Sequence, residues 1–179
     1  IAEQSGWRLP DVILYPTGGG TGLVGMGRAF LAQRELGWTA GPLPRLVAVQ
    51  TRGCAPVVRA FEQGADRTEP GADARTLASG LRVPAPFADR LILRALRESG
   101  GTAVAVSEER MLDGMLHLPT REGLFACPAG GATVAALRLL LVPIHGPGLV
   151  EEPMRLGRGG RRPRARHVRR RGLAEVVEP

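Results

Sequence analysis

The chain has 179 residues, of which 44% are hydrophobic and only 4% are aromatic. This length favours one domain with an aliphatic core, and two cysteines are too few for a disulfide framework or a zinc cluster. No stretch reaches the roughly 18 apolar residues that a membrane span needs, so we expect a cytoplasmic protein. The net charge of +7 is unevenly placed, with +2 over residues 1–142 and +5 over residues 143–179.

Short apolar runs alternate with helical patterns along the first 141 residues. Runs bounded by Gly, Pro or Ser predict buried parallel strands at residues 12–15, 46–49 and 103–106. Helices are expected at residues 23–36, 56–62, 87–99, 107–117 and 132–141, with Ser107 as an N-cap and Gly37 just past the first helix. The polar stretch 64–75 is expected to be a surface loop. This order predicts an α/β fold with a mostly parallel sheet layered with helices.

A glycine-rich turn follows the first predicted strand directly. It contains Gly18, Gly19, Gly20 and Gly22, and the next predicted helix begins beside it. Glycine allows a positive φ, so the backbone N–H groups can surround an anion at the positive end of that helix. The turn lacks the Lys and Ser/Thr of a P-loop and the later acid of a dinucleotide fingerprint. The alternative is a turn that only joins strand to helix.

Five segments in the same order resemble the later part of bacterial threonine synthase, a pyridoxal-phosphate (PLP) enzyme of fold type II, the tryptophan-synthase-β-like class. They are residues 9–26, 47–61, 76–84, 87–101 and 125–136. The resemblance covers roughly residues 1–141 and implies an incomplete large domain of such an enzyme.

The resemblance also implies the residues that contact the cofactor. The amides of Gly18, Gly19, Gly20, Thr21 and Gly22 are expected to hold the PLP phosphate, to which the Thr21 hydroxyl can add a hydrogen bond. Ser79 and Gly80 are candidates for facing the PLP ring or the substrate, with a simple turn between helices as the alternative.

The chain contains no lysine, because all 24 residues counted as Lys or Arg are Arg. Enzymes of this kind hold PLP through a lysine amine, and an arginine guanidinium cannot replace that amine. The resemblance places the lysine in an earlier domain that this chain lacks, so no catalytic residue is assigned here.

The expected function is therefore the PLP-phosphate-binding part of a threonine synthase-like enzyme, inactive alone. The intact relative would convert O-phosphohomoserine to threonine, and a homodimer is a candidate assembly. A threonine or serine ammonia-lyase-like fragment is the alternative within the same class.

The last part of the chain differs from the rest in composition. Residues 1–142 are expected to be the domain fragment, and residues 143–179 to be an Arg/Gly/Pro-rich tail that is either disordered or an aberrant, frameshifted end. Its functional alternative is a non-catalytic module that binds a polyanion such as nucleic acid. Cys54 and Cys127 stand in apolar contexts and are expected to be reduced packing residues.

Overall fold

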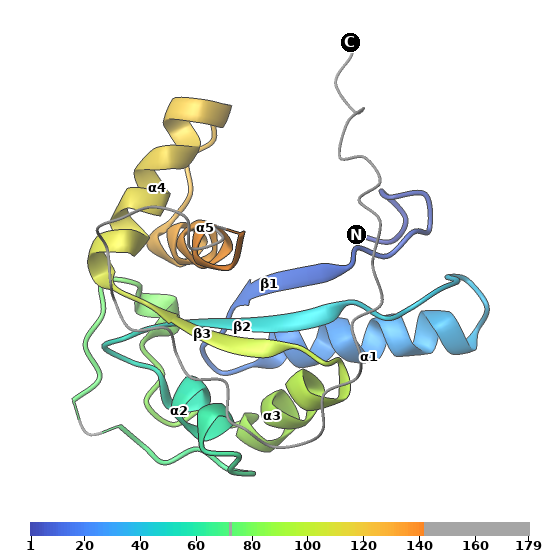
Figure 1. The fold of residues 1–179 in the computed structure, drawn as a ribbon, viewed down its shortest axis with the longest axis horizontal. Helices are drawn as coiled ribbons and strands as arrows, with labels where there is room; N and C mark the ends of the chain where they lie inside the picture. The colour runs from blue at the N-terminus through green and yellow to red at the C-terminus, as the bar shows by residue number, and fades with distance from the viewer. Residues whose placement is uncertain (72, 142–179) are drawn as a thin grey trace, which may run out of the picture.

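The computed structural model describes residues 1–71 and 73–141, which form an α/β structure. Their sheet is parallel, with strands in the order β1-β2-β3 (Figure 1). The strands are β1 (Val12–Pro16), β2 (Arg45–Thr51) and β3 (Thr102–Val106). The predicted tail at 143–179 lies outside the described residues.

Helices cover both faces of this sheet (Figure 1). One face carries α1 (Thr21–Glu35), α2 (Pro56–Glu62) and α3 (Asp89–Glu98), and the other carries α4 (Glu108–Glu122) and α5 (Pro128–Leu141). A short 3₁₀ helix, η1 (Ser79–Leu81), joins the core on the α4 and α5 side. The fold class predicted from the sequence is confirmed.

The central strand β2 is buried on both faces because its neighbours supply a hydrophobic layer on each side. Leu46 and Ala48 pack into the cluster with α1, α2 and α3, whereas Val47 and Val49 pack into the cluster with α4 and α5. This alternation follows from the two-residue period of a strand. Most of the buried side chains are Leu, Val and Ala, so the predicted aliphatic core is also confirmed.

Most of the predicted boundaries agree with the structure. The three strands and helices α1, α2 and α3 begin and end within two residues of the expected positions. Ser107 caps α4, since its hydroxyl accepts a hydrogen bond from the Arg110 amide at 3.3 Å. Gly37, just past α1, has a φ of 73°, the left-handed conformation that ends many helices.

Two helix boundaries on the other face differ from the sequence prediction. Helix α4 continues past residue 117 to Glu122, with Pro119 inside it, and ends at Gly123, where φ is 66°. Helix α5 begins at Pro128 rather than at residue 132. At Gly131, near its start, it crosses α4 so closely that a Cβ on Gly114 would overlap the Gly131 carbonyl oxygen.

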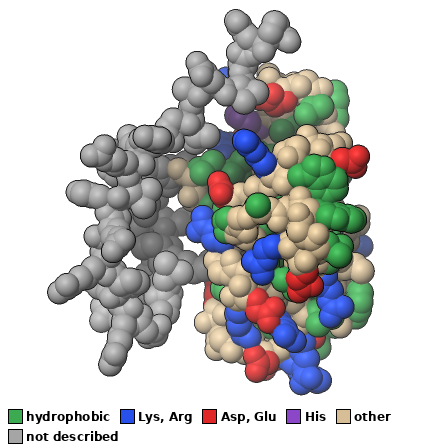
Figure 2. Space-filling view, turned by 90° about the vertical axis from the view of Figure 1, so that its right-hand side faces the viewer, with side chains coloured by type: hydrophobic (Ala, Val, Ile, Leu, Met, Phe, Trp, Pro, Cys, Tyr) green, Lys and Arg blue, Asp and Glu red, His purple; other side chains and the backbone are tan. Residues whose placement is uncertain are grey.

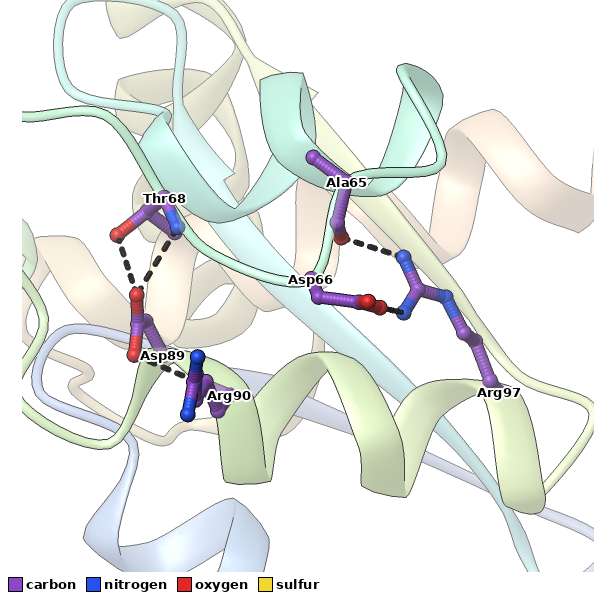
Figure 3. A network of polar contacts seen from close by, with 6 residues as sticks. All are labelled: Ala65, Asp66, Thr68, Asp89, Arg90 and Arg97. Carbon is purple, nitrogen blue, oxygen red and sulfur yellow. Dashed lines mark hydrogen bonds and ion pairs between the residues drawn. The ribbon is translucent and has the colours of Figure 1, made fainter.

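Polar contacts fix the loop after α2 along helix α3 (Figure 3). The Asp89 carboxylate accepts hydrogen bonds from the Thr68 amide at 2.9 Å and from the Arg90 amide at 2.6 Å. Partial burial raises the pKa of Asp89, but the hydrogen bonds from Thr68 and Arg90 outweigh it, so the pKa lies below its ordinary value. At the other end of α3, Arg97 pairs with Asp66 at 2.7 Å. The loop therefore holds α3 in place from both ends.

Candidate functional site

The glycine-rich turn lies between β1 and α1, at the carboxyl edge of the parallel sheet (Figure 1). Ligands of α/β proteins bind at this edge because strand ends and helix N-termini meet there. Gly20 has a φ of 94°, and a Cβ there would overlap the Ile92 side chain of α3. A Cβ on Gly18 would overlap the carbonyl oxygen of Gly80. The turn thus needs glycine both for its backbone conformation and for close packing.

The amides of this turn are free to bind a ligand. Across residues 1–71 and 73–141, no protein acceptor takes a hydrogen bond from the amides of residues 18–23. The N-cap residue of α1 is Gly20, which has no side chain to satisfy them, whereas Ser107 caps α4. Helix N-termini leave such donors unpaired, and their partial positive charge attracts an anion. The turn is therefore built to hold an oxyanion such as a phosphate group.

Sequence reasoning missed a buried polar side chain behind the turn. Gln50 is 0% exposed and lies at the carboxyl end of β2. Its Nε2 donates to the Thr17 carbonyl at 3.0 Å, and its Oε1 accepts from the Val57 amide at 2.9 Å. The predicted strand stopped at residue 49, one residue short of this side chain. The sequence did contain a signal for this side chain, because Gln50, a polar amide, directly follows the apolar run 46–49.

A second buried polar group lies at the same edge of the sheet. The Thr51 side chain is 0% exposed, and its hydroxyl has no hydrogen-bond partner among the described residues. It ends β2 on the face that packs against α4 and α5, since it alternates with Gln50 along the strand. The sequence prediction did not single it out.

The other predicted site residues lie around the turn. Thr21 is the first residue of α1 and is exposed. Ser79 and Gly80 belong to η1 and are also exposed, and the backbone of Gly80 comes up against Gly18. The structure thus brings the two predicted segments together. That these residues contact a cofactor stays a prediction.

The two cysteines have different environments. Cys54 is buried, as expected for a packing residue, whereas Cys127 is exposed at the start of α5. The expectation of a packing role for Cys127 was wrong, because the loop before α5 leaves it on the surface. Among the residues that the structure describes, no three His, Cys, Asp or Glu side chains are grouped as a metal site would require. Within the same residues, none of the helices combines the length and apolar character of a bilayer span.

Together, a parallel α/β sheet and unpaired amides at its carboxyl edge are typical of α/β proteins that bind phosphate groups. Comparison with known proteins makes this class specific. A family model described as "Pyridoxal-phosphate dependent enzyme" matches residues 1–148. The chain belongs to this pyridoxal-phosphate dependent enzyme family.

Relatives within the family include threonine synthases. The chain is 35% identical over 141 residues to threonine synthase of Methanosarcina acetivorans, covering 79% of this chain and 35% of the relative. It is 30% identical over 141 residues to threonine synthase of Methanocaldococcus jannaschii, with the same coverage of each protein. This chain therefore spans about a third of the length of these relatives.

Solved structures give a consistent result. The threonine deaminase of T.th. superposes with a TM-score of 0.60 at 27% identity, over 79% of this chain and 48% of that protein. Threonine synthase from Escherichia coli superposes with a TM-score of 0.56 at 22% identity, over 74% of this chain and 30% of that protein, which supports the fold alone.

The residues present fit the phosphate group of the family's cofactor. PLP carries a phosphate ester, and the free amides of residues 18–23 supply several donors for its oxygens. No charged side chain is needed, because helix N-termini bind phosphate through backbone groups. This fit concerns the phosphate, and no described residue is assigned to the pyridine ring.

Proposed function

We propose that this chain carries the PLP-phosphate site of a cytoplasmic, threonine synthase-like enzyme that acts on O-phosphohomoserine. The run of amides without acceptors at residues 18–23, placed before α1, carries this proposal. The 141-residue match to threonine synthases supports the choice of reaction.

The described residues account for binding and orientation rather than for chemistry. The amides of residues 18–22 hold the phosphate, and the Thr21 hydroxyl adds a donor at the surface of the turn. When bound, PLP supplies an electron sink that stabilises carbanions of amino acids. Proton transfer in this family needs a lysine amine, and the sequence has none. The chain alone is therefore proposed to bind the cofactor without turning over substrate.

Comparing PLP with pyridoxal tests this proposal, because the two molecules differ only in the phosphate. The full chain should bind PLP more tightly than pyridoxal, and PLP and inorganic phosphate should both shift the NMR amide signals of residues 18–22. Equal affinity for the two molecules, or shifts confined to other residues, would contradict the proposed site. Ser107→Ala is a matched control, since it removes the cap of α4 and leaves the turn unchanged.

An ammonia-lyase is the second candidate within the same family. The superposition on threonine deaminase favours it, at 27% identity and a TM-score of 0.60. The two reactions release different products: phosphate from O-phosphohomoserine, or ammonia from threonine or serine. Two fusions, of this chain to the remaining part of the M. acetivorans threonine synthase and to that of the T.th. threonine deaminase, assayed for both products, separate them. Phosphate release by the first fusion without ammonia release by the second supports the threonine synthase-like reaction.

A polyanion-binding module is the candidate outside the enzyme class. It rests on the Arg-rich residues 143–179, which lie outside the described residues. On the face that Figure 2 shows, Arg side chains are mixed with Asp and Glu rather than gathered into one basic patch. We therefore assign this candidate function to the tail.

A further inference from the structure

Gln50 is a polar side chain in an otherwise apolar layer. It follows Leu46 and Ala48 on the face of β2 that packs against α1, α2 and α3, and it is 0% exposed. Burying an amide is unfavourable unless its donors and acceptor are paired. The contacts that pair it connect the glycine-rich turn to α2.

The orientation of the Gln50 amide is fixed by its partners. The amides of Val57 and Val58 both donate to Oε1, at 2.9 and 3.3 Å, so only the oxygen end can face them. The nitrogen end then faces the turn, where Nε2 donates to the Thr17 carbonyl at 3.0 Å. On its other side, Thr17 donates its own amide to the Val49 carbonyl at 2.8 Å. Thr17 is therefore held by the backbone of β2 at Val49 and by the side chain of Gln50 on the same strand.

The Thr17 carbonyl and the Gly18 N–H belong to one planar peptide group. Because this group is planar and trans, the direction of the carbonyl sets the direction of the N–H. A hydrogen bond to the carbonyl also polarises the peptide and strengthens the N–H as a donor. The Gln50 side chain therefore orients and strengthens Gly18, the first free amide of the turn.

We propose that Gln50 is a positioning residue of the phosphate site, which acts on a bound phosphate through the Thr17–Gly18 peptide and does not touch it. This inference rests on the proposed function of the turn. It deepens that function, because it names the side chain that pre-orients the site before a ligand arrives.

Two variants of the full chain separate the contacts of Gln50. Gln50→Glu keeps an acceptor for Val57 and Val58 but loses the donor to Thr17. Gln50→Met is neutral and of similar size, and it loses both. Val47→Ala is the matched control, since Val47 lies on the same strand but in the core on the opposite face. Each variant is titrated with PLP and with pyridoxal, and the Gly18 amide signal is recorded without ligand.

Gln50→Met should lower the preference for PLP over pyridoxal by about fivefold, the equivalent of one ordinary hydrogen bond. Gln50→Glu should lower it further, because its carboxylate also repels the phosphate. The Gly18 amide proton should also move upfield before any ligand is added. Val47→Ala should lower stability while leaving the PLP preference and the Gly18 signal unchanged. If Gln50→Met does not fold, the ligand-free Gly18 amide signal of Gln50→Glu decides, because that signal does not depend on repulsion between the new carboxylate and a bound phosphate.

The possible failures are distinguishable. A wild-type chain that binds PLP and pyridoxal equally would refute the phosphate site itself and this inference with it. A wild-type preference for PLP that persists in the folded Gln50 variants would refute only the role of Gln50. Equal loss of preference in Val47→Ala would show a general effect of destabilisation and would also overturn the inference.

Discussion

Replacing Thr21 with Asp should strengthen helix α1 and weaken the anion site at the same time. Thr21 is the exposed first residue of α1, and the helix has no side-chain cap and no acidic residue in its first turn. A carboxylate there interacts favourably with the helix dipole and should raise the free energy of unfolding by about 0.5 kcal/mol. The same charge repels a bound phosphate and competes for the same amides.

The size of the repulsion depends on how much water reaches the turn. Two like unit charges about 6 Å apart repel by about 0.7 kcal/mol in water and by about 3 kcal/mol at an effective dielectric constant of about 20. These limits correspond to a loss of phosphate affinity between about threefold and about a hundredfold. Because the turn is partly buried, we expect a result well above the lower limit.

Urea unfolding and titration with inorganic phosphate measure the two effects separately. Thr21→Asn is neutral and of similar size but also removes the Thr21 hydroxyl, so the difference in phosphate affinity between Thr21→Asp and Thr21→Asn measures the effect of the charge alone. Ala29→Asp adds the same charge to an exposed position about 12 Å along α1, beyond the screening length of about 8 Å at physiological salt. Unchanged phosphate affinity in Thr21→Asp, with the fold intact, would refute the assignment of the site to this turn.

Three further predictions concern stability, covalent binding and the tail. Asp89→Asn should lower the free energy of unfolding by about 1 kcal/mol at neutral pH. Because folding lowers the pKa of Asp89, that difference should be full above its ordinary pKa of about 3.8 and should be lost as pH falls further, through the lower pKa of the folded state, as pH-dependent urea unfolding can show. Reduction of the chain with borohydride in the presence of PLP should give no side-chain adduct by mass spectrometry, since the sequence has no lysine. If the tail binds nucleic acid, affinity should fall steeply with salt and vanish when residues 155–179 are deleted, with the melting temperature unchanged.

The sequence was sufficient for the strands and for the helices on one face. Residues 12–15 and 46–49 are short apolar runs followed by Pro16 and Gln50, a length and composition that favour a strand. The proline at the start of α2 and Ser107 before α4 marked the starts of these two helices, because proline suits the first turn of a helix and a serine hydroxyl can accept a hydrogen bond from its first amides. Each of these signals determines the structure of only a few neighbouring residues, so it could be read from the sequence without knowing any tertiary contact.

Features that depend on packing between distant segments were not predictable in this way. Gly130 and Gly131 are adjacent glycines, which locally favour a turn, yet both belong to α5, and at Gly131 helix α4 approaches too closely for a side chain. Gln50 was missed because the partner of its Nε2, the Thr17 carbonyl, becomes its neighbour only when β1 and β2 pair. The exposure of Cys127 likewise depends on the path of the loop before α5.

The phosphate site and the catalytic machinery place different demands on the chain. The proposed phosphate site consists of backbone amides, which one strand, one turn and one helix supply together. All of these elements lie within this chain. Catalysis instead needs a nucleophilic amine, which only a particular side chain supplies, and none of the basic residues of this chain is lysine. Cofactor binding and turnover should accordingly be separable in this protein, with the first present in the chain and the second dependent on a lysine from elsewhere.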